Sequence, residues 1–377
     1  MPVRPPLEPP PNTDTGDPGY IDFRHPAYPD SEAALLRFAA IDGDHGDGVD
    51  FEVALVACGI ITGNTWHCGY IAEMDTGGGY VKVDKSTTDV LRRRTYYYFV
   101  DEQRPGYKYP VIPSFDHWRF PHRNLPFAWK NINMPQASRS MLKRKIAAQD
   151  RDGTCRISRH ASALEVAHFV PVADEKWFAS NKMDQYVKSG SETRPTEDPT
   201  NLITLRRDIH YLFDTRRFTF VPKQDTARQE WSLALHVFAP DENPDLIPLY
   251  HNRSPAPLSG ISIEHVFARF AWTIFSEKTL RFFKGVAEYV VLLFDPQAGK
   301  VIETKLRSPE VRMSLKIFSS SSRTPSPKKR PRDQSAEDDQ FWGEERDDVS
   351  VASDWDPPRG RRRERSWDYC NSNSPPG

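Results

Sequence analysis

Residues 155–178 read CRISRHASALEVAHFVPVADEKWF, and residues 198–223 read DPTNLITLRRDIHYLFDTRRFTFVPK. In the first stretch, Cys155–Ser158 and Leu164–Val170 predict two short β-strands joined by a tight linker. In the second stretch, the pattern predicts a helix from about Arg206 to Asp214 and a closing strand after it. Together the two stretches predict a β-hairpin, a polar loop, a helix and a further strand.

Polar side chains fall at three positions of this predicted unit. His168 lies on the second strand, Asn201 in the loop and His210 on the helix. Because His210 and Asp214 are four residues apart, they share one helical face. An imidazole and a carboxylate at this spacing can bind one divalent cation together.

This order of strand histidine, loop asparagine and helix histidine resembles the HNH endonuclease family. The chain is most similar to the branch common in filamentous fungi, whose pattern runs AHxxP … DPxNLixLRxDxHxxFD … FxxVPK. The match is dense from Ala167 to Lys223, apart from the variable loop at 172–197. The resemblance implies a ββα-metal domain that hydrolyses phosphodiester bonds in DNA with the help of a bound cation.

The resemblance also implies a role for each site residue. His168 matches the general base that deprotonates the attacking water, and Asn201 matches the residue that holds this histidine by bonding its backbone. His210 matches a metal ligand, and Asp214 lies where many relatives place another ligand. Four arginines flank the helix and either contact phosphates or are plain solvated charges: Arg206, Arg207, Arg216 and Arg217.

Two departures from the family pattern affect the expected chemistry. Many relatives have a metal-binding Asp or His directly before the strand histidine, where this chain has Ala167. Strand alternation puts Ala167 and Glu165 on one face of the strand and His168 on the other. Two protein ligands completed by water and phosphate suit Mg²⁺ or Mn²⁺ better than Zn²⁺. Some relatives also carry two CxxC pairs, whereas Cys155 stands alone, so no structural zinc is expected. The alternative is a catalytically degenerate HNH fold that binds nucleic acid or a protein partner.

The whole chain predicts an α+β protein built from several parts. A disordered arm is expected at residues 1–19, where six of the first eleven residues are proline, followed by a β-rich unit at 20–103. A segment rich in proline and aromatic residues connects it, over 104–137, to an HNH-like domain at 138–310. That domain includes an amphipathic helix at Ile263–Phe283 and a strand pair at Tyr289–Phe294 and Lys300–Lys305. A disordered charged tail is expected at 311–377.

Several further elements are predicted from local patterns. Ser31–Ala40 predicts a short helix capped by Ser31. Apolar runs predict strands at Val49–Gly59, Gly69–Glu73, Val81–Val83, Thr95–Val100, Ser232–Phe238 and Asp245–Tyr250.

Charge is distributed unevenly along the chain. Residues 1–60 hold 3 basic and 11 acidic side chains, whereas residues 139–223 hold 16 basic and 11 acidic ones. Contact with a phosphate backbone is therefore expected from the central part rather than from the N-terminal part. The tail clusters Pro327–Arg332 and Arg359–Arg365 are typical of nuclear import signals or non-specific nucleic-acid contacts, and the alternative is a solvated charge block.

Cysteine usage and hydrophobicity indicate the compartment. Four cysteines are too few and too scattered for a disulfide framework, which favours a reducing environment. The first residues contain no apolar segment of a secretory signal, and no run approaches 18 apolar residues. We therefore expect an intracellular protein that binds no membrane and is nuclear if the tail clusters act as import signals.

Overall fold

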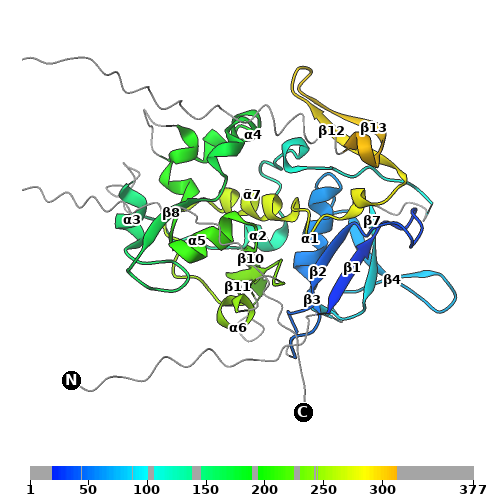
Figure 1. The fold of residues 1–377 in the computed structure, drawn as a ribbon, viewed down its shortest axis with the longest axis horizontal. Helices are drawn as coiled ribbons and strands as arrows, with labels where there is room; N and C mark the ends of the chain where they lie inside the picture. The colour runs from blue at the N-terminus through cyan, green and yellow to red at the C-terminus, as the bar shows by residue number, and fades with distance from the viewer. Residues whose placement is uncertain are drawn as a thin grey trace, which may run out of the picture. The chain divides into compact units, whose positions relative to one another are not determined.

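The N-terminal part of the fold is a five-stranded sheet with the order β2-β1-β7-β4-β5 (Figure 1). β1 runs parallel to β7, and the other neighbouring strands are antiparallel. A helix, α1 (Phe51–Ile61), lies on one face of the sheet. The strands are β1 (Tyr20–Arg24), β2 (Leu36–Ala39), β4 (Gly69–Met74), β5 (Tyr80–Lys82) and β7 (Thr95–Val100).

Two predictions for this part are wrong. The expected helix at Ser31–Ala40 is replaced by the strand β2, because Leu36–Ala39 pairs along β1 and Arg37 forms two hydrogen bonds with Asp22 of β1. The expected strand at Val49–Gly59 is mostly the helix α1. Asp50 caps this helix by accepting a hydrogen bond from the Val53 backbone N–H at 2.9 Å.

The HNH-like segment folds as strand, loop, strand and helix. β8 (Leu164–His168) pairs antiparallel with β9 (Leu202–Arg206), and α5 (Arg207–Asp214) follows directly. The predicted strand at Cys155–Ser158 is wrong, because those residues form a turn, and the partner of β8 comes from the far side of the loop. The predicted helix is confirmed within a residue of its expected start.

The remaining elements are distributed over both parts of the chain. The predicted strand at Asp245–Tyr250 is instead the short helix α6 (Leu246–Tyr250). The long amphipathic helix ends earlier than predicted, as α7 (Ile263–Ile274), because residues 279–281 extend and hydrogen-bond to the edge of β2. The others are β3 (Val49–Asp50), β6 (Val90–Leu91), α2 (Phe127–Lys130), α3 (Ile146–Asp152), α4 (Glu175–Ser180), β10 (Phe218–Gln224), β11 (Trp231–Val237), β12 (Glu288–Asp295) and β13 (Lys300–Arg307).

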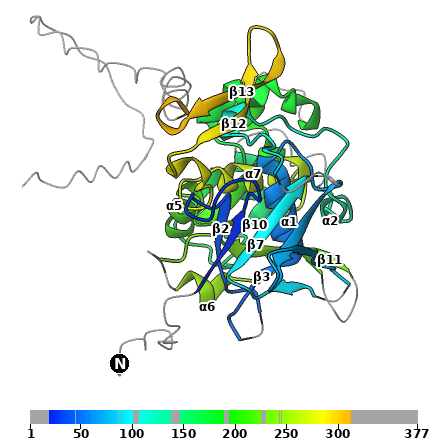
Figure 2. The same ribbon diagram turned by 90° about the vertical axis from the view of Figure 1, so that its right-hand side faces the viewer.

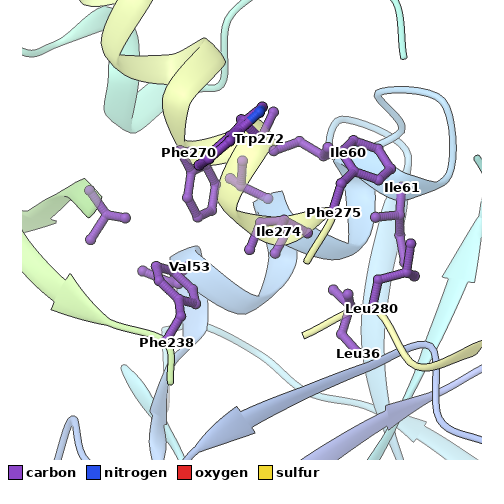
Figure 3. Close-up of a cluster of buried hydrophobic side chains, with 14 of the residues drawn as sticks. Leu36, Val53, Ile60, Ile61, Phe238, Phe270, Trp272, Ile274, Phe275 and Leu280 are labelled. Carbon is purple, nitrogen blue, oxygen red and sulfur yellow. The ribbon is translucent and has the colours of Figure 1, made fainter. Parts of the chain in front are cut away.

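A single hydrophobic core joins the N-terminal sheet to the HNH-like segment, and α7 lies at its centre (Figures 1 and 2). Nearly every side chain of α7 is buried. Figure 3 shows Phe270 and Ile274 of α7 beside Val53 and Ile60 of α1, with Phe238 next to them. The burial of this helix on all sides therefore couples the two parts of the chain mechanically.

The computed structural model describes residues 19–311 apart from 44, 87, 101–105, 138–145, 189–193, 225–229, 242 and 244. These residues form an α+β fold and belong to one compact unit, Met1–Thr324. The predicted arm and tail lie outside the described residues except at Gly19 and Val311, and the domain boundaries near 103 and 138 stay predictions. None of the described helices combines the length and the apolar character needed to cross a membrane.

Candidate metal centre

His168 occupies the last position of β8, next to the loop that leads to α4. Its neighbours Ala167 and Phe169 are fully buried in the core, whereas the imidazole of His168 is 17% exposed. The His168 Nε2 lies 3.6 Å from the Glu197 Oε2. The imidazole is thus held at the edge of the core with part of its ring exposed, while its Nε2 is buried beside a carboxylate.

Asn201 fixes the backbone that follows His168. Its side chain accepts a hydrogen bond from the Val170 N–H at 2.9 Å and donates to the Val170 carbonyl at 3.0 Å. The amide also donates to the Thr196 carbonyl, and the backbone carbonyl of Asn201 accepts from the Phe169 N–H at 2.9 Å. Asn201 is fully buried, so no water competes for these bonds.

His210 and Asp214 converge on the exposed side of α5. The His210 Nε2 lies 3.1 Å from the Asp214 Oδ2, as their spacing of one helical turn requires. The other ring nitrogen, Nδ1, lies 2.9 Å from the Oε2 of Glu165 on β8. Sequence reasoning missed Glu165 as a site residue. Strand alternation nevertheless places it on the same face of β8 as Ala167, and this is the signal that could have identified it.

The electrostatics keep both carboxylates ionised around the imidazole. The pKa of His210 is raised, mainly by the hydrogen bond to Asp214 and further by Glu165. Partial burial alone would raise the pKa of Asp214, but the hydrogen bond from His210 and the charges of Arg269 and His168 lower it instead. The pKa of Glu165 is lowered by its hydrogen bond with His210. The imidazole therefore lies between two carboxylates, an arrangement that favours its protonated form.

These donors fit a divalent cation. The His210 Nε2 and the Asp214 Oδ2, 3.1 Å apart, would be the two protein ligands of such a cation. The Asp214 side chain is 54% exposed, which leaves room for water and phosphate as further ligands.

Residues 154–221 match the family model described as HNH endonuclease. Over this segment the chain is similar to HNH endonucleases. Neither curated proteins nor solved structures give a match to the chain. The matched segment includes β8, β9 and α5 and therefore all of His168, Asn201, His210 and Asp214. An HNH domain is typical of hydrolytic nucleases, whereas the narrower resemblance to a fungal branch stays a prediction.

The four arginines that flank α5 differ in their contacts. Arg207 is 80% exposed and bonds Glu165, while Arg206 is paired with Asp208. Arg216 instead turns inward, with a positive φ of 61°, and lies 3.7 Å from the centre of the Trp272 ring. Arg217 is buried. The guanidinium of Arg216 is engaged with the Trp272 ring and the Phe275 carbonyl, and Arg217 is buried, so Arg206 and Arg207 are the two more accessible candidates for phosphate contact, which stays a prediction for all four.

A second group of potential ligands lies away from this site. Among the described residues, Asp42, His236 and His251 bring three potential ligand atoms within 4.8 Å of one another. The ammonium of Lys223 already lies 2.8 Å from the Asp42 Oδ1. The His251 Nδ1 accepts from the Val237 N–H, so the proton is on Nε2, which donates to Asp42 at 3.0 Å. This arrangement favours a buried ion cluster over a metal site.

Proposed function

We propose that the HNH domain is a divalent-metal-dependent endonuclease that hydrolyses phosphodiester bonds in DNA, with His168 as the general base. The pair of His210 and Asp214, with 3.1 Å between Nε2 and Oδ2, carries the proposal. The pair offers an imidazole nitrogen and a carboxylate oxygen, both able to bind a divalent cation, on a helix of the same segment as His168.

Three side chains and the cation have separate roles in the proposed reaction. His168 takes a proton from the attacking water, and the nearby Glu197 carboxylate stabilises the imidazolium that forms. Asn201 keeps the end of β8 in place through its bonds to Val170. When bound, the cation stabilises the charge that develops on the phosphate and on the leaving oxygen.

Glu165 acts on the ligand rather than on the cation. A metal-binding imidazole commonly donates its second N–H to a carboxylate, which fixes the tautomer and the orientation of the ring. Glu165 accepts from the His210 Nδ1 in this way, so the Nε2 faces Asp214. To hold a cation together with Asp214, His210 would have to offer a neutral imidazole, with its remaining proton on Nδ1 toward Glu165.

Two protein ligands favour Mg²⁺ or Mn²⁺ over Zn²⁺, because the harder cations keep several waters and accept phosphate oxygens. Arg206 and Arg207, next to the metal ligands, would contact the DNA backbone. Basic clusters beyond residue 311 lead us to propose a nuclear location for the protein.

The second candidate function is binding without cleavage. It is favoured by Ala167, whose buried methyl group stands where many relatives have a metal ligand. A degenerate HNH fold of this kind would keep nucleic-acid affinity but would not turn over substrate.

Nicking of a plasmid in the presence of Mg²⁺ or Mn²⁺, with and without a chelator, tests the proposal. Cleavage of a single-stranded RNA under the same conditions tests whether DNA rather than RNA is the substrate. His168→Ala should lower cleavage by roughly 10²–10⁴-fold while Mn²⁺ stays bound in calorimetry. His210→Ala should abolish Mn²⁺ binding, and His160→Ala, at an exposed position of the same domain, is the matched control.

Three outcomes separate the candidates. Chelator-sensitive nicking that requires His168 supports the nuclease. DNA binding by a wild-type protein that shows no cleavage under any of these conditions supports the degenerate fold. Loss of Mn²⁺ binding in His168→Ala would make His168 a ligand and contradict its role as the base.

A further inference from the structure

Arg269 is the most deeply buried charged side chain near the HNH site, and it lies on α7, outside the matched residues 154–221. Its Nη1 donates to the carbonyl of His168 at 3.2 Å and to that of Phe169 at 3.4 Å. Its Nη2 donates to the carbonyl of Phe213 and lies 3.7 Å from the Asp214 Oδ1. One guanidinium thus reaches both the end of β8 and the end of α5.

The environment of Arg269 holds this guanidinium rigidly. The guanidinium carbon lies 3.6 Å from the centre of the Phe213 ring and 4.3 Å from that of the Trp272 ring. Trp272 is itself fixed by its hydrogen bond to Asp174 at 2.9 Å. A planar guanidinium clamped between aromatic rings cannot follow independent movements of the strand and the helix.

The same helix also contacts the loop that carries Asn201. The Ser262 N–H at the start of α7 donates to the Thr200 carbonyl at 3.0 Å, and the His265 Nδ1 lies 3.1 Å from the same oxygen. α7 therefore contacts the strand, the loop and the helix that carry the candidate site residues.

We propose that Arg269 is a positioning residue of the HNH site, which sets the spacing between the strand that carries His168 and the helix that carries Asp214. The inference rests on the proposed nuclease function for its consequence in catalysis. The other part of the proposal is that Arg269 links the end of β8 to the end of α5, and it depends only on the contacts of Arg269.

A charge-only role predicts a different result from a brace. If only positive charge near Asp214 mattered, Arg269→Lys would retain full function. A lysine presents a single ammonium, however, and cannot bond the carbonyls of β8 and α5 at the same time. The brace therefore predicts a defect in Arg269→Lys as well as in Arg269→Met, with the lysine variant intermediate.

Arg119 provides the matched control. It is also partly buried, donates to a backbone carbonyl, that of Asp116 at 2.7 Å, and lies 3.7 Å from the centre of the Phe294 ring. None of its hydrogen bonds within the described residues involves His168, Asn201, His210 or Asp214. Arg119→Met should therefore lose stability through the same kinds of contact without altering the site.

The experiment uses the full-length protein and measures kcat and KM for DNA cleavage, the Kd for Mn²⁺, and the ring resonances of His168 and His210 by NMR in the absence of metal. We expect Arg269→Met to lower kcat by roughly 10²-fold with a small change in KM, as a displacement of about 1 Å would do. The two histidine resonances should shift in Arg269→Met and stay in place in Arg119→Met.

The outcomes separate failure of the brace from failure of the nuclease. If Arg269→Met matches Arg119→Met in kcat and in both histidine resonances, the positioning role is wrong. If the wild type neither cleaves DNA nor binds Mn²⁺, the proposed function is wrong. The resonances then decide the brace alone, because unchanged positions in folded Arg269→Met would overturn it. If Arg269→Met does not fold, kcat and the two histidine resonances of Arg269→Lys are compared with those of Arg119→Met instead.

Discussion

Replacing Asp42 by asparagine should destabilise the protein strongly, because this carboxylate neutralises a buried cluster. Its side chain is 1% exposed, and its Oδ1 lies 2.8 Å from the Lys223 Nζ and 3.0 Å from the His251 Nε2. The Oδ2 accepts from the Asp50 N–H at 2.8 Å. Lys223 lies on β10, so the cluster ties the loop after β2 to the HNH side of the fold.

The expected magnitude follows from what the substitution leaves behind. Breaking a buried ion pair by removing one partner costs about 3–5 kcal/mol. Lys223 would still have Asp50 at 3.1 Å, so the loss should fall near the lower end of that range. The entropy of unfolding is about 2.1 cal/mol/K per residue, or roughly 0.6 kcal/mol/K for a unit of about 300 residues, so a loss of about 3 kcal/mol should lower Tm by roughly 5 °C.

Guanidinium unfolding of Asp42→Asn, followed by circular dichroism, measures the effect directly. Asp47→Asn is the matched control, because the ion pair of Asp47 with Arg92 is about half exposed and should contribute less than about 1 kcal/mol. The double variant Asp42→Asn/Lys223→Met should be more stable than the sum of the single effects implies. Equal midpoints for the two Asp→Asn variants would refute the reasoning. A Zn²⁺-dependent rise in Tm that requires Asp42 would also contradict the ion-cluster interpretation.

Three further predictions concern the carboxylate that bonds His210, the pH dependence of stability and the C-terminal tail. Glu165→Ala should weaken Mn²⁺ binding by roughly 10–100-fold in calorimetry, while Glu175→Ala on α4 leaves it unchanged; equal affinities would remove Glu165 from the site. Burial lowers the pKa of His117 and of His236 to about 4. The unfolded chain, where histidine titrates near 6.5, therefore binds more protons between pH 6.5 and 4. The free energy of unfolding should fall as pH falls through that window, and urea midpoints that do not change would contradict this. Deleting residues 320–377 should leave Tm within a degree or two and remove the protein from the nucleus; an unchanged location would make the tail clusters a solvated charge block.

Elements with one clear local signal could be predicted from the sequence. Alternating or β-branched runs gave β7, β11, β12 and β13 nearly within their observed bounds, and the amphipathic pattern gave α5. The order of His168, Asn201 and His210 was sufficient to expect the ββα segment. In these cases the local preference and the tertiary packing favour the same structure.

Predictions were wrong where tertiary pairing decides. Val49–Gly59 is apolar except at Asp50 and Glu52 and is largely buried in the core, so periodicity alone could not separate a strand from the helix α1. The partner of β8 is β9, at the end of a long loop, and a nearby hairpin partner was the simpler expectation. Arg269 had no signal at all in the sequence, because its contacts to His168 and Phe213 exist only once α7 is in place.

The position of α7 limits how the nuclease motif can be transplanted. The matched segment ends at residue 221, yet the helix that closes its rear face begins at Ile263 and packs its other side on α1. Residues 154–221 cut out alone would expose an apolar surface where α7 belongs and would lose the Arg269 guanidinium behind Asp214. We therefore expect that residues 154–221 of this protein do not fold stably on their own. A fusion of this segment to another protein would have to include α7 and an apolar surface that replaces the N-terminal part on which α7 packs.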